Sequence, residues 1–381
     1  MLRETARQCR STPCGNNISP RYSAVMRTLI RPTAFVDSPF GHDGKVARLA
    51  GGMCWFAAVE LLVIEDDRRV SSELLPVEDI ENRFDDDIAA QWAALTSARA
   101  PLQLGERTIR LDQPQVMGIV NATPDSFSDG GRFADAPAAA GAGAQMAADG
   151  AAIIDVGGES TRPGARMIWE GDEIERIAPV IRQLAGGGVA VSADTRKADV
   201  MTAAVEAGAR MVNDVSALTY DERSANVVGA SGVPVVLMHH KGPPETMQDD
   251  PHYDDVLVEV YLWLEERIGA AVEAGIAREK ILVDPGFGFG KKLVHNLELM
   301  NGLALFHSLG CPLVLGASRK RTIGALSNEA PADRRLGGSI AFALKAVEQG
   351  VQILRVHDVF ETVQALRVWR GLRDQALTPR V

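Results

Sequence analysis

Residues 150–160 read GAAIIDVGGES, and the short apolar run at 152–156 is the clearest indication of the fold. Its near-continuous Ile and Val content is typical of a parallel strand that is buried on both faces. Runs of the same kind recur along the chain at residues 116–120, 189–192, 210–212, 234–238, 281–283, 312–315 and 352–356. We therefore expect eight parallel strands between residue 116 and the C-terminus.

Helical patterns occupy the spaces between these runs. One apolar stripe is formed by Leu293, Val294, Leu297, Met300 and Leu303, and a second by Leu336, Ile340, Leu344 and Val347. Strands alternating with helices over roughly 260 residues match the usual size of a closed (β/α)₈ barrel, so we predict an α/β TIM barrel over residues 111–381. An open doubly wound sheet is the alternative, although that fold would lead us to expect a GxGxxG turn after the first strand, and there is none.

Composition limits the classes of protein to which the chain can belong. Its 381 residues are 46% apolar, enough for one large domain and a smaller one. A net charge of −10 argues against a nucleic-acid partner, and no apolar run approaches the ~20 residues of a membrane helix. The 4 cysteines form no CxxC pair, which favours reduced thiols in a cytoplasmic protein.

The N-terminal third differs from the rest. Residues 1–25 are rich in Arg, Ser, Asn and Pro, and we expect a disordered leader or an over-extended start, with Met26 as the true beginning. Residues 26–110 hold strand-like pieces at 27–32 and 61–65 and a helical pattern at 88–97. We expect a small α+β appendage there, without a catalytic set of its own, that serves packing or oligomer contact.

Polar residues close or follow every one of the predicted barrel strands. They are Asn121, Asp155, Asp194, Asn213, Asp214, His239, Asp284, Ser318, Arg319, Lys320, Arg355 and His357. A single case could be a helix cap or a satisfied core group, but the C-terminal ends of barrel strands carry the chemistry in this fold. We therefore predict that the active site is built from this row.

The row divides by charge. Asp155, Asp194, Asn213 and Asp284 suit a nitrogen-rich heterocycle with N–H donors and a carbonyl group. Arg162, Lys320, Arg355 and His357 offer charge-assisted donors, which suit a phosphate or a carboxylate. A ligand with a polar ring and an anionic tail would use both sets.

Five segments carry a family resemblance: MGIVNATPDSFSDGG (117–131), GAAIIDVGGESTRPGA (150–165), DPGFGFGK (284–291), GASRK (316–320) and RVHDV (355–359). In these segments the chain resembles dihydropteroate synthase, a family of pterin-binding TIM barrels. The resemblance extends from residue 116 to about 373 and touches every predicted strand end. It implies a transferase of folate biosynthesis that joins 4-aminobenzoate to 6-hydroxymethyl-7,8-dihydropterin diphosphate and releases diphosphate and 7,8-dihydropteroate.

The resemblance also implies roles for individual residues. Asp194, Asn213, Asp284 and Lys320 would hold the pterin, while Asn121, Arg355 and His357 would bind the diphosphate, with Asn121 also a ligand of Mg²⁺. Thr161, Arg162 and Pro163 would close over the aminobenzoate, and Phe289 and Ser318 would line its pocket. Loops at 128–131 and 160–165 are candidate lids, and a homodimer through barrel helices is the implied assembly.

Some interpretations remain open at this point. Asp155 could contact the ligand directly or be a buried anchor for loop hydrogen bonds. We expect the other four histidines in and after this region, His240, His252, His295 and His307, to be solvated. The chain departs from the family pattern in two segments. After Met238-His239 the family usually has a second Met, where this chain has His240-Lys241, and after Ser318-Arg319-Lys320 it usually has Ser-Phe, where this chain has Arg321-Thr322.

Two rival functions are considered. A pterin-binding methyltransferase that uses methyltetrahydrofolate would share the aspartates and the asparagine but would not need the cationic set. A catalytically silent paralogue that acts as a partner protein should have lost the diphosphate and aminobenzoate residues, yet all of them are present.

Overall fold

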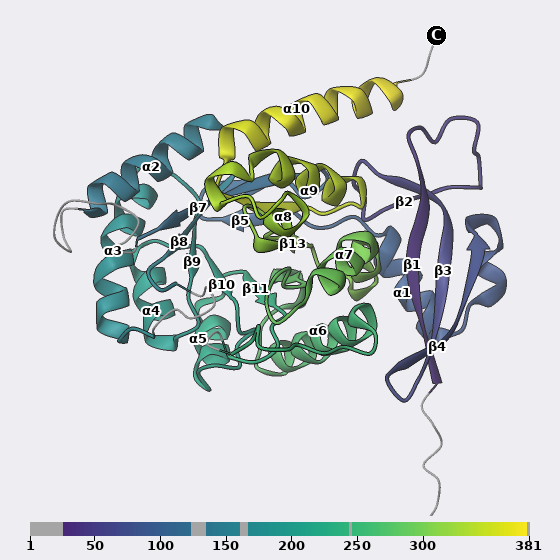
Figure 1. Ribbon diagram of the computed structural model, residues 1–381, viewed down its shortest axis with the longest axis horizontal. Coiled ribbons are helices and arrows are strands. Elements are labelled where there is room, and N and C mark those ends of the chain that lie inside the picture. Colours follow the sequence, from purple (N-terminus) through teal and green to yellow (C-terminus); the bar gives the residue numbers. More distant parts are fainter. Residues whose placement is uncertain (1–25, 123–134, 161–166, 244–245, 379–381) are drawn as a thin grey trace, which may run out of the picture.

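The computed structural model describes residues 26–122, 135–160, 167–243 and 246–378. A barrel surrounded by helices makes up the larger part, and an N-terminal sheet lies beside it (Figure 1). Among the described residues, no helix has the length and apolarity needed to cross a membrane.

The barrel contains eight parallel strands in the order β12-β11-β10-β9-β8-β7-β14-β13. A bridge between Val283 and Leu313 joins the first strand of this order to the last, so the sheet is closed and the open-sheet alternative is wrong. The strands are β7 (Gln115–Asn121), β8 (Ile153–Gly157), β9 (Val191–Asp194), β10 (Met211–Asp214), β11 (Val235–Met238), β12 (Ile281–Asp284), β13 (Val314–Leu315) and β14 (Ile353–Val356). Each overlaps a predicted apolar run, and the predicted TIM barrel is confirmed.

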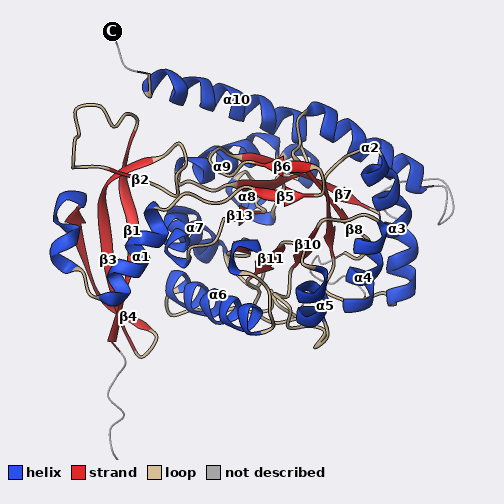
Figure 2. Ribbon diagram, turned by 180° about the vertical axis from the view of Figure 1, so that it is seen from behind, coloured by secondary structure: helices blue, strands red, loops and turns tan. Residues whose placement is uncertain are grey.

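Helices cover the outside of the barrel (Figure 2). They are α2 (Asp135–Asp149), α3 (Glu170–Gly186), α4 (Ala198–Ala207), α5 (Ser224–Ser231), α6 (Val256–Glu273), α7 (Leu293–Gly302), α8 (Arg321–Leu326), α9 (Leu336–Glu348) and α10 (Val359–Ala376). Short 3₁₀ turns lie at η3 (Arg278–Lys280), η4 (Leu303–Leu309) and η5 (Ala332–Arg334).

A hairpin closes the N-terminal end of the barrel. Strands β5 (Leu102–Leu104) and β6 (Arg107–Ile109) pair antiparallel. Their buried residues Leu102, Leu104 and Ile109 share one apolar cluster with residues of seven barrel strands and with Ala190, which directly precedes β9. Because this end is filled, the described residues leave the C-terminal ends of the strands as the side from which a ligand can approach the barrel.

The apolar stripe predicted to begin at Leu293 is wrong for its first two residues, which lie at the start of α7. Leu293 is 40% and Val294 52% exposed, while His295 and Asn296 are buried in their place. The reason is local hydrogen bonding: Asn296 accepts from the Gly288 amide, and His295 Nδ1 accepts from the Lys292 amide. Polar side chains thus take inward positions because they satisfy the loop before the helix.

Two of the histidines expected to be solvated are buried. His295 is 9% exposed and His307 is fully buried, with its Nε2 3.0 Å from the carbonyl oxygen of Gln349. Burial lowers the pKa of His307 to about 3, so this ring is neutral and structural.

The N-terminal appendage is an antiparallel sheet with helices at its edge. Strand β3 (Trp55–Glu65) pairs with β1 (Met26–Val36), with β4 (Arg68–Pro76) and with the short β2 (Ala47–Arg48). The 3₁₀ helix η1 (Val77–Arg83) and the helix α1 (Asp86–Thr96) follow. The expected pieces at 27–32, 61–65 and 88–97 overlap β1, β3 and α1.

The appendage is docked on the barrel by apolar and polar contacts. Leu29, Leu62 and Ile64 are buried in the same cluster as Tyr261 of α6 and Leu299 of α7. The C-terminal part of α10 extends to this sheet (Figure 1). There the largely buried guanidinium of Arg373 donates to the carbonyl oxygens of Met53, at 2.7 Å, and Val36, at 3.3 Å.

We expect Arg373→Met to lower the free energy of unfolding by about 1–3 kcal/mol, because it leaves the Met53 and Val36 carbonyl oxygens without these donors. Arg367→Met, on the exposed side of the same helix, is the matched control and should change it by less than about 0.5 kcal/mol. Urea denaturation of both variants checks this. Equal losses of unfolding free energy in the two variants would show that the contacts of Arg373 with the appendage do not stabilise the protein.

Candidate active site

The predicted polar row lies at the C-terminal mouth of the barrel, opposite the hairpin. Asn121, Asp194, Asp214 and Asp284 are the last residues of β7, β9, β10 and β12. The parallel register pairs Asn213 with Asp194 and Asn121 with Gly157, so neighbouring strand ends stand level. The fold therefore brings the described members of the row to one rim.

The centre of this rim is a buried cluster of charges. Arg355 donates through Nε to Asp155 Oδ2 at 2.6 Å and through Nη2 to Asp194 Oδ2 at 2.5 Å. Asn213 Nδ2 donates to the same Asp155 oxygen at 3.0 Å. Asp155 is fully buried, so its role as an anchor within the protein is the one that the geometry supports.

This cluster changes the predicted division of the row. Arg355 was predicted to belong to a cationic set apart from the acids, whereas its guanidinium lies between two of them. The reason is electrostatic, since two carboxylates buried this close need a counter-charge. The second oxygen of Asp155 has no hydrogen-bond partner among the described residues.

Burial and neighbouring charges have opposite effects on the pKa values of the groups in this cluster. Burial raises the pKa of Asp194, and Arg355 opposes that rise. Burial also disfavours the charged form of Arg355, but the carboxylates of Asp155 and Asp194 outweigh it and raise the pKa of the guanidinium. Burial raises the pKa of Asp284, while the Gly286 amide, which donates to its Oδ1 at 2.7 Å, favours the ionised form.

The turn after β12 carries Phe289 into the site. The ammonium of Lys320 lies 4.0 Å from the centre of the Phe289 ring, a cation–π contact between two predicted site residues. Ser318 contributes to the same wall, where its Oγ accepts from the His357 amide at 3.2 Å and lies 3.1 Å from His357 Nδ1. Lys320, Ser318, His357 and Phe289 therefore form one side of the mouth.

A buried lysine supports this turn and was missed by the sequence analysis. Lys291 Nζ donates to the carbonyl oxygens of Gly286 and Phe289 at 3.0 and 3.1 Å, and lies 2.8 Å from His239 Nδ1. Burial lowers the pKa of both Lys291 and His239 well below their usual values. The position of Lys291 at the end of the DPGFGFGK segment was a signal that could have suggested this role.

A second buried network was also missed. Lys197 Nζ donates to Glu173 at 2.7 Å and to Glu159 at 3.1 Å, and Arg196 donates to Glu159 at 3.1 Å. Glu159 also accepts from the amide of Ile168. These ion pairs lie next to the Asp194-Thr195 segment, and adjacent Arg-Lys residues directly after it could have indicated them.

Some predicted site residues lie outside the described residues. Thr161, Arg162 and Pro163 are among them, as are the proposed lid at 128–131 and most of the one at 160–165. Asn121 is described and is partly exposed at the end of β7. Within the described part of the chain, no group of three or more His, Cys, Asp and Glu side chains could hold a metal by itself.

Comparison with known proteins now adds to this geometry. The family model described as pterin binding enzyme matches residues 117–357. The dihydropteroate synthase of Escherichia coli strain K12 is 47% identical over 262 residues, which are 68% of this chain and 92% of that protein. The chain belongs to the dihydropteroate synthase family. The enzyme of Bacillus subtilis strain 168 is 44% identical over 68% of this chain and 89% of its own length.

Solved structures of the dihydropteroate synthase family agree. One from Xanthomonas albilineans, with 4-aminobenzoic acid, has a TM-score of 0.69 and 46% identity and covers 74% of this chain and 100% of that one. Another from the same organism, in complex with 7,8-dihydropteroate, has a TM-score of 0.66 and 44% identity over 73% of this chain and 100% of that one. The family is a transferase family, and the family model begins only at residue 117, after the appendage.

We expect Arg355→Met to be strongly destabilising, by about 3–5 kcal/mol near pH 8, because it leaves Asp155 and Asp194 buried without their counter-ion. A buried carboxyl with a raised pKa stabilises the fold when it is protonated and loses this contribution as the pH rises through that pKa. The loss should therefore shrink as the pH falls toward about 5. Thermal unfolding across this range measures it.

Two further variants test the cause of this loss. Arg319→Met removes a more exposed pair, with Asp358, and should cost less than about 1 kcal/mol at every pH. Adding Asp194→Asn to Arg355→Met should restore stability near pH 8, since it removes one unpaired charge. A pH-independent loss in Arg355→Met would contradict the electrostatic explanation.

Proposed function

We propose that the barrel condenses 6-hydroxymethyl-7,8-dihydropterin diphosphate with 4-aminobenzoate, giving 7,8-dihydropteroate and diphosphate. The observation that carries the proposal is the joint position of buried acceptors, Asp155, Asn213 and Asp284, and of the cations Lys320 and Arg355 at one barrel mouth. The named relatives and the solved complexes with 4-aminobenzoic acid and 7,8-dihydropteroate support it. They favour a synthase over a methyltransferase.

The chemistry follows from the two substrates. The bond between the pterin methylene carbon and the diphosphate oxygen breaks, and the amine of 4-aminobenzoate forms a bond to that carbon and loses a proton. The pterin ring delocalises the positive charge that develops at the methylene carbon. The buried side chains of Asn213 and Asp284 would hold the ring N–H groups and carbonyl in place, with Asp155 anchoring Asn213. A neutral aromatic amine needs no general base of matched pKa to attack such a cation.

The cationic side chains of the mouth complete the proposal. Lys320, Arg355 and His357 would stabilise the departing diphosphate, and Phe289 and Ser318 would line the aminobenzoate pocket. Thr161, Arg162 and Pro163 are proposed to close over this pocket, and Asp194 is proposed to hold the pterin together with Lys320.

The residues present fit a magnesium ion that arrives with the diphosphate. Asn121 offers one hard amide oxygen at the rim, and Mg²⁺ is commonly bound by few protein groups together with substrate phosphates and water. When bound, Mg²⁺ would supply positive charge to the leaving diphosphate. We assign Asn121 to it as the ligand that this chain provides.

We further propose a homodimer with α10 at its interface. Phe360, Val368 and Leu372 are 56%, 62% and 68% exposed on this helix, and Leu336 at the start of the neighbouring α9 is 37% exposed. The predicted stripe of α9 is thus only partly inward, since Ser339, Ala343 and Ala346 are buried instead of Leu336. Apolar side chains gathered on adjacent helices suit a second copy of the same surface.

We propose a cytoplasmic location for the protein, as expected from its cysteines. Cys54 and Cys311 are both free and buried. Such thiols suit a reducing compartment, and we place the chain in the cytoplasm on that basis.

Purified protein with Mg²⁺, the pterin diphosphate and labelled 4-aminobenzoate should form dihydropteroate and diphosphate in equal amounts. Lys320→Ala should lower kcat/KM by about 10²–10³-fold, since it removes a charge beside the leaving group. Arg321→Ala, which removes the exposed cation next in the chain, is the control and should leave kcat/KM within about twofold. A folded wild-type sample without turnover would favour the silent paralogue.

The dimer is tested separately by sedimentation equilibrium. Wild-type protein should give twice the mass of the chain. The double variant Val368→Glu and Leu372→Glu should give the monomer mass, because it places two charges in the apolar surface. A wild-type monomer, or an unchanged dimer in the variant, would reject this interface.

A further inference from the structure

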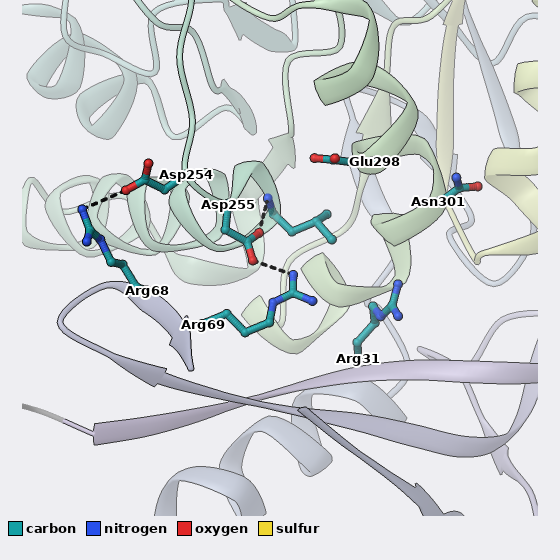
Figure 3. Close-up of a pocket in the computed structure, with 8 residues that line it drawn as sticks. Arg31, Arg68, Arg69, Asp254, Asp255, Glu298 and Asn301 are labelled. Carbon is teal, nitrogen blue, oxygen red and sulfur yellow. Dashed lines mark hydrogen bonds and ion pairs between the residues drawn. The ribbon is translucent and has the colours of Figure 1, made fainter. Parts of the chain in front are cut away.

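The appendage contacts the barrel at the loop that precedes α6. Arg69 of β4 pairs with Asp255 at 2.7 Å, and Arg68 pairs with Asp254 at 2.9 Å (Figure 3). The Arg69 pair is the more buried, with side chains 28% and 20% exposed, against 74% and 52% for the Arg68 pair. A cavity of about 800 Å³ lies between the two parts and is lined by these four residues together with Arg31, Leu257, Glu298 and Asn301.

These two aspartates end the segment 246–255, which is the last part of the connection from β11 to α6. Asp255 is the N-cap of α6 and accepts from the amides of Leu257 and Val258. The amide of Asp254 donates to Glu259 at 2.7 Å. The segment therefore meets the appendage at the point where its backbone is already fixed to a long helix.

The same segment holds the turn that carries Phe289. Gln248 Nε2 donates to the carbonyl oxygen of Gly288 at 2.7 Å, and the Tyr253 hydroxyl donates to that of Gly290 at 2.9 Å. The carbonyl oxygens of both residues that flank Phe289 in the chain thus accept from this one segment. A shift of the segment would move the Phe289 ring and, through the 4.0 Å cation–π contact, the ammonium of Lys320.

A lysine next to a departure from the family pattern reinforces this arrangement. Lys241, in the segment where the family usually has a second Met, donates to the carbonyl oxygen of His252 at 2.6 Å and lies 4.1 Å from the centre of the Tyr253 ring. It also pairs with Glu259 at 3.2 Å. Lys241 and the added sheet therefore both contact the same ten-residue segment, 246–255.

We propose that Arg69, assisted by Arg68, is a positioning residue for the aminobenzoate wall of the active site. It acts through Asp255, the segment 246–255 and the turn at Phe289. The proposal rests on the proposed function, because it assumes that Phe289 lines the aminobenzoate pocket. The sheet that supplies Arg69 precedes the part of the chain that the family model matches, so this support is an addition to the barrel.

The test uses the full-length enzyme and steady-state kinetics with both substrates. Arg69→Ala should raise KM for 4-aminobenzoate by about threefold to tenfold, a range that corresponds to one partly buried ion pair, and should change KM for the pterin diphosphate by less than about twofold. Arg69→Lys should recover part of the loss, because an ammonium can still pair with Asp255. Arg68→Ala should have a smaller effect, since its pair is exposed.

The matched control is Arg27→Ala. Arg27 also comes from the appendage and also pairs with α6, through two hydrogen bonds of 2.6 and 2.9 Å to Glu265, but it lies away from the loop segment. We expect Arg27→Ala to lower Tm as much as Arg69→Ala while leaving both KM values unchanged. If the two variants share one kinetic profile, Arg69 only docks the appendage and the proposal is wrong. Absence of wild-type turnover would instead reject the proposed function.

Discussion

The ion cluster of Arg355 with Asp155 and Asp194 is the interaction on which the rest of the mouth depends. A fully buried carboxylate is tolerated in a barrel core only when a counter-charge and hydrogen bonds replace the water it has lost. Arg355 and Asn213 supply both, and the cluster connects four strands, β8, β9, β10 and β14. The acceptor side of the site is therefore held in place before any ligand arrives.

The strands were predictable because their signal is local. Each barrel strand is a short apolar run bounded by polar or glycine residues, and even the two-residue β13 lies within such a run. Because parallel strands end at the same rim, residues such as Asn121, Asp194 and Asp284 could be placed at one site from the sequence. The family motifs then supplied roles that a strand pattern does not contain.

Other features had no local signal. The hairpin strands β5 and β6 are three residues each, too short for a recognisable pattern. The contact of Arg355 with Asp155 joins positions 200 residues apart, and no spacing rule reveals it. The buried face of α7 begins with His295 and Asn296 rather than with apolar residues, because loop amides and carbonyls had to be satisfied there. In each case tertiary hydrogen bonding or charge decided the outcome.

The hairpin at the N-terminal end of the barrel limits the order in which ligands can bind and leave. With Leu102, Leu104 and Ile109 filling that end, the described part of the chain leaves the barrel interior open at the C-terminal ends of the strands. Two ligands stacked along the barrel axis must enter and depart at these strand ends, so the inner one cannot leave while the outer one is bound. The architecture thus imposes a last-in, first-out sequence on any such pair, independent of their affinities.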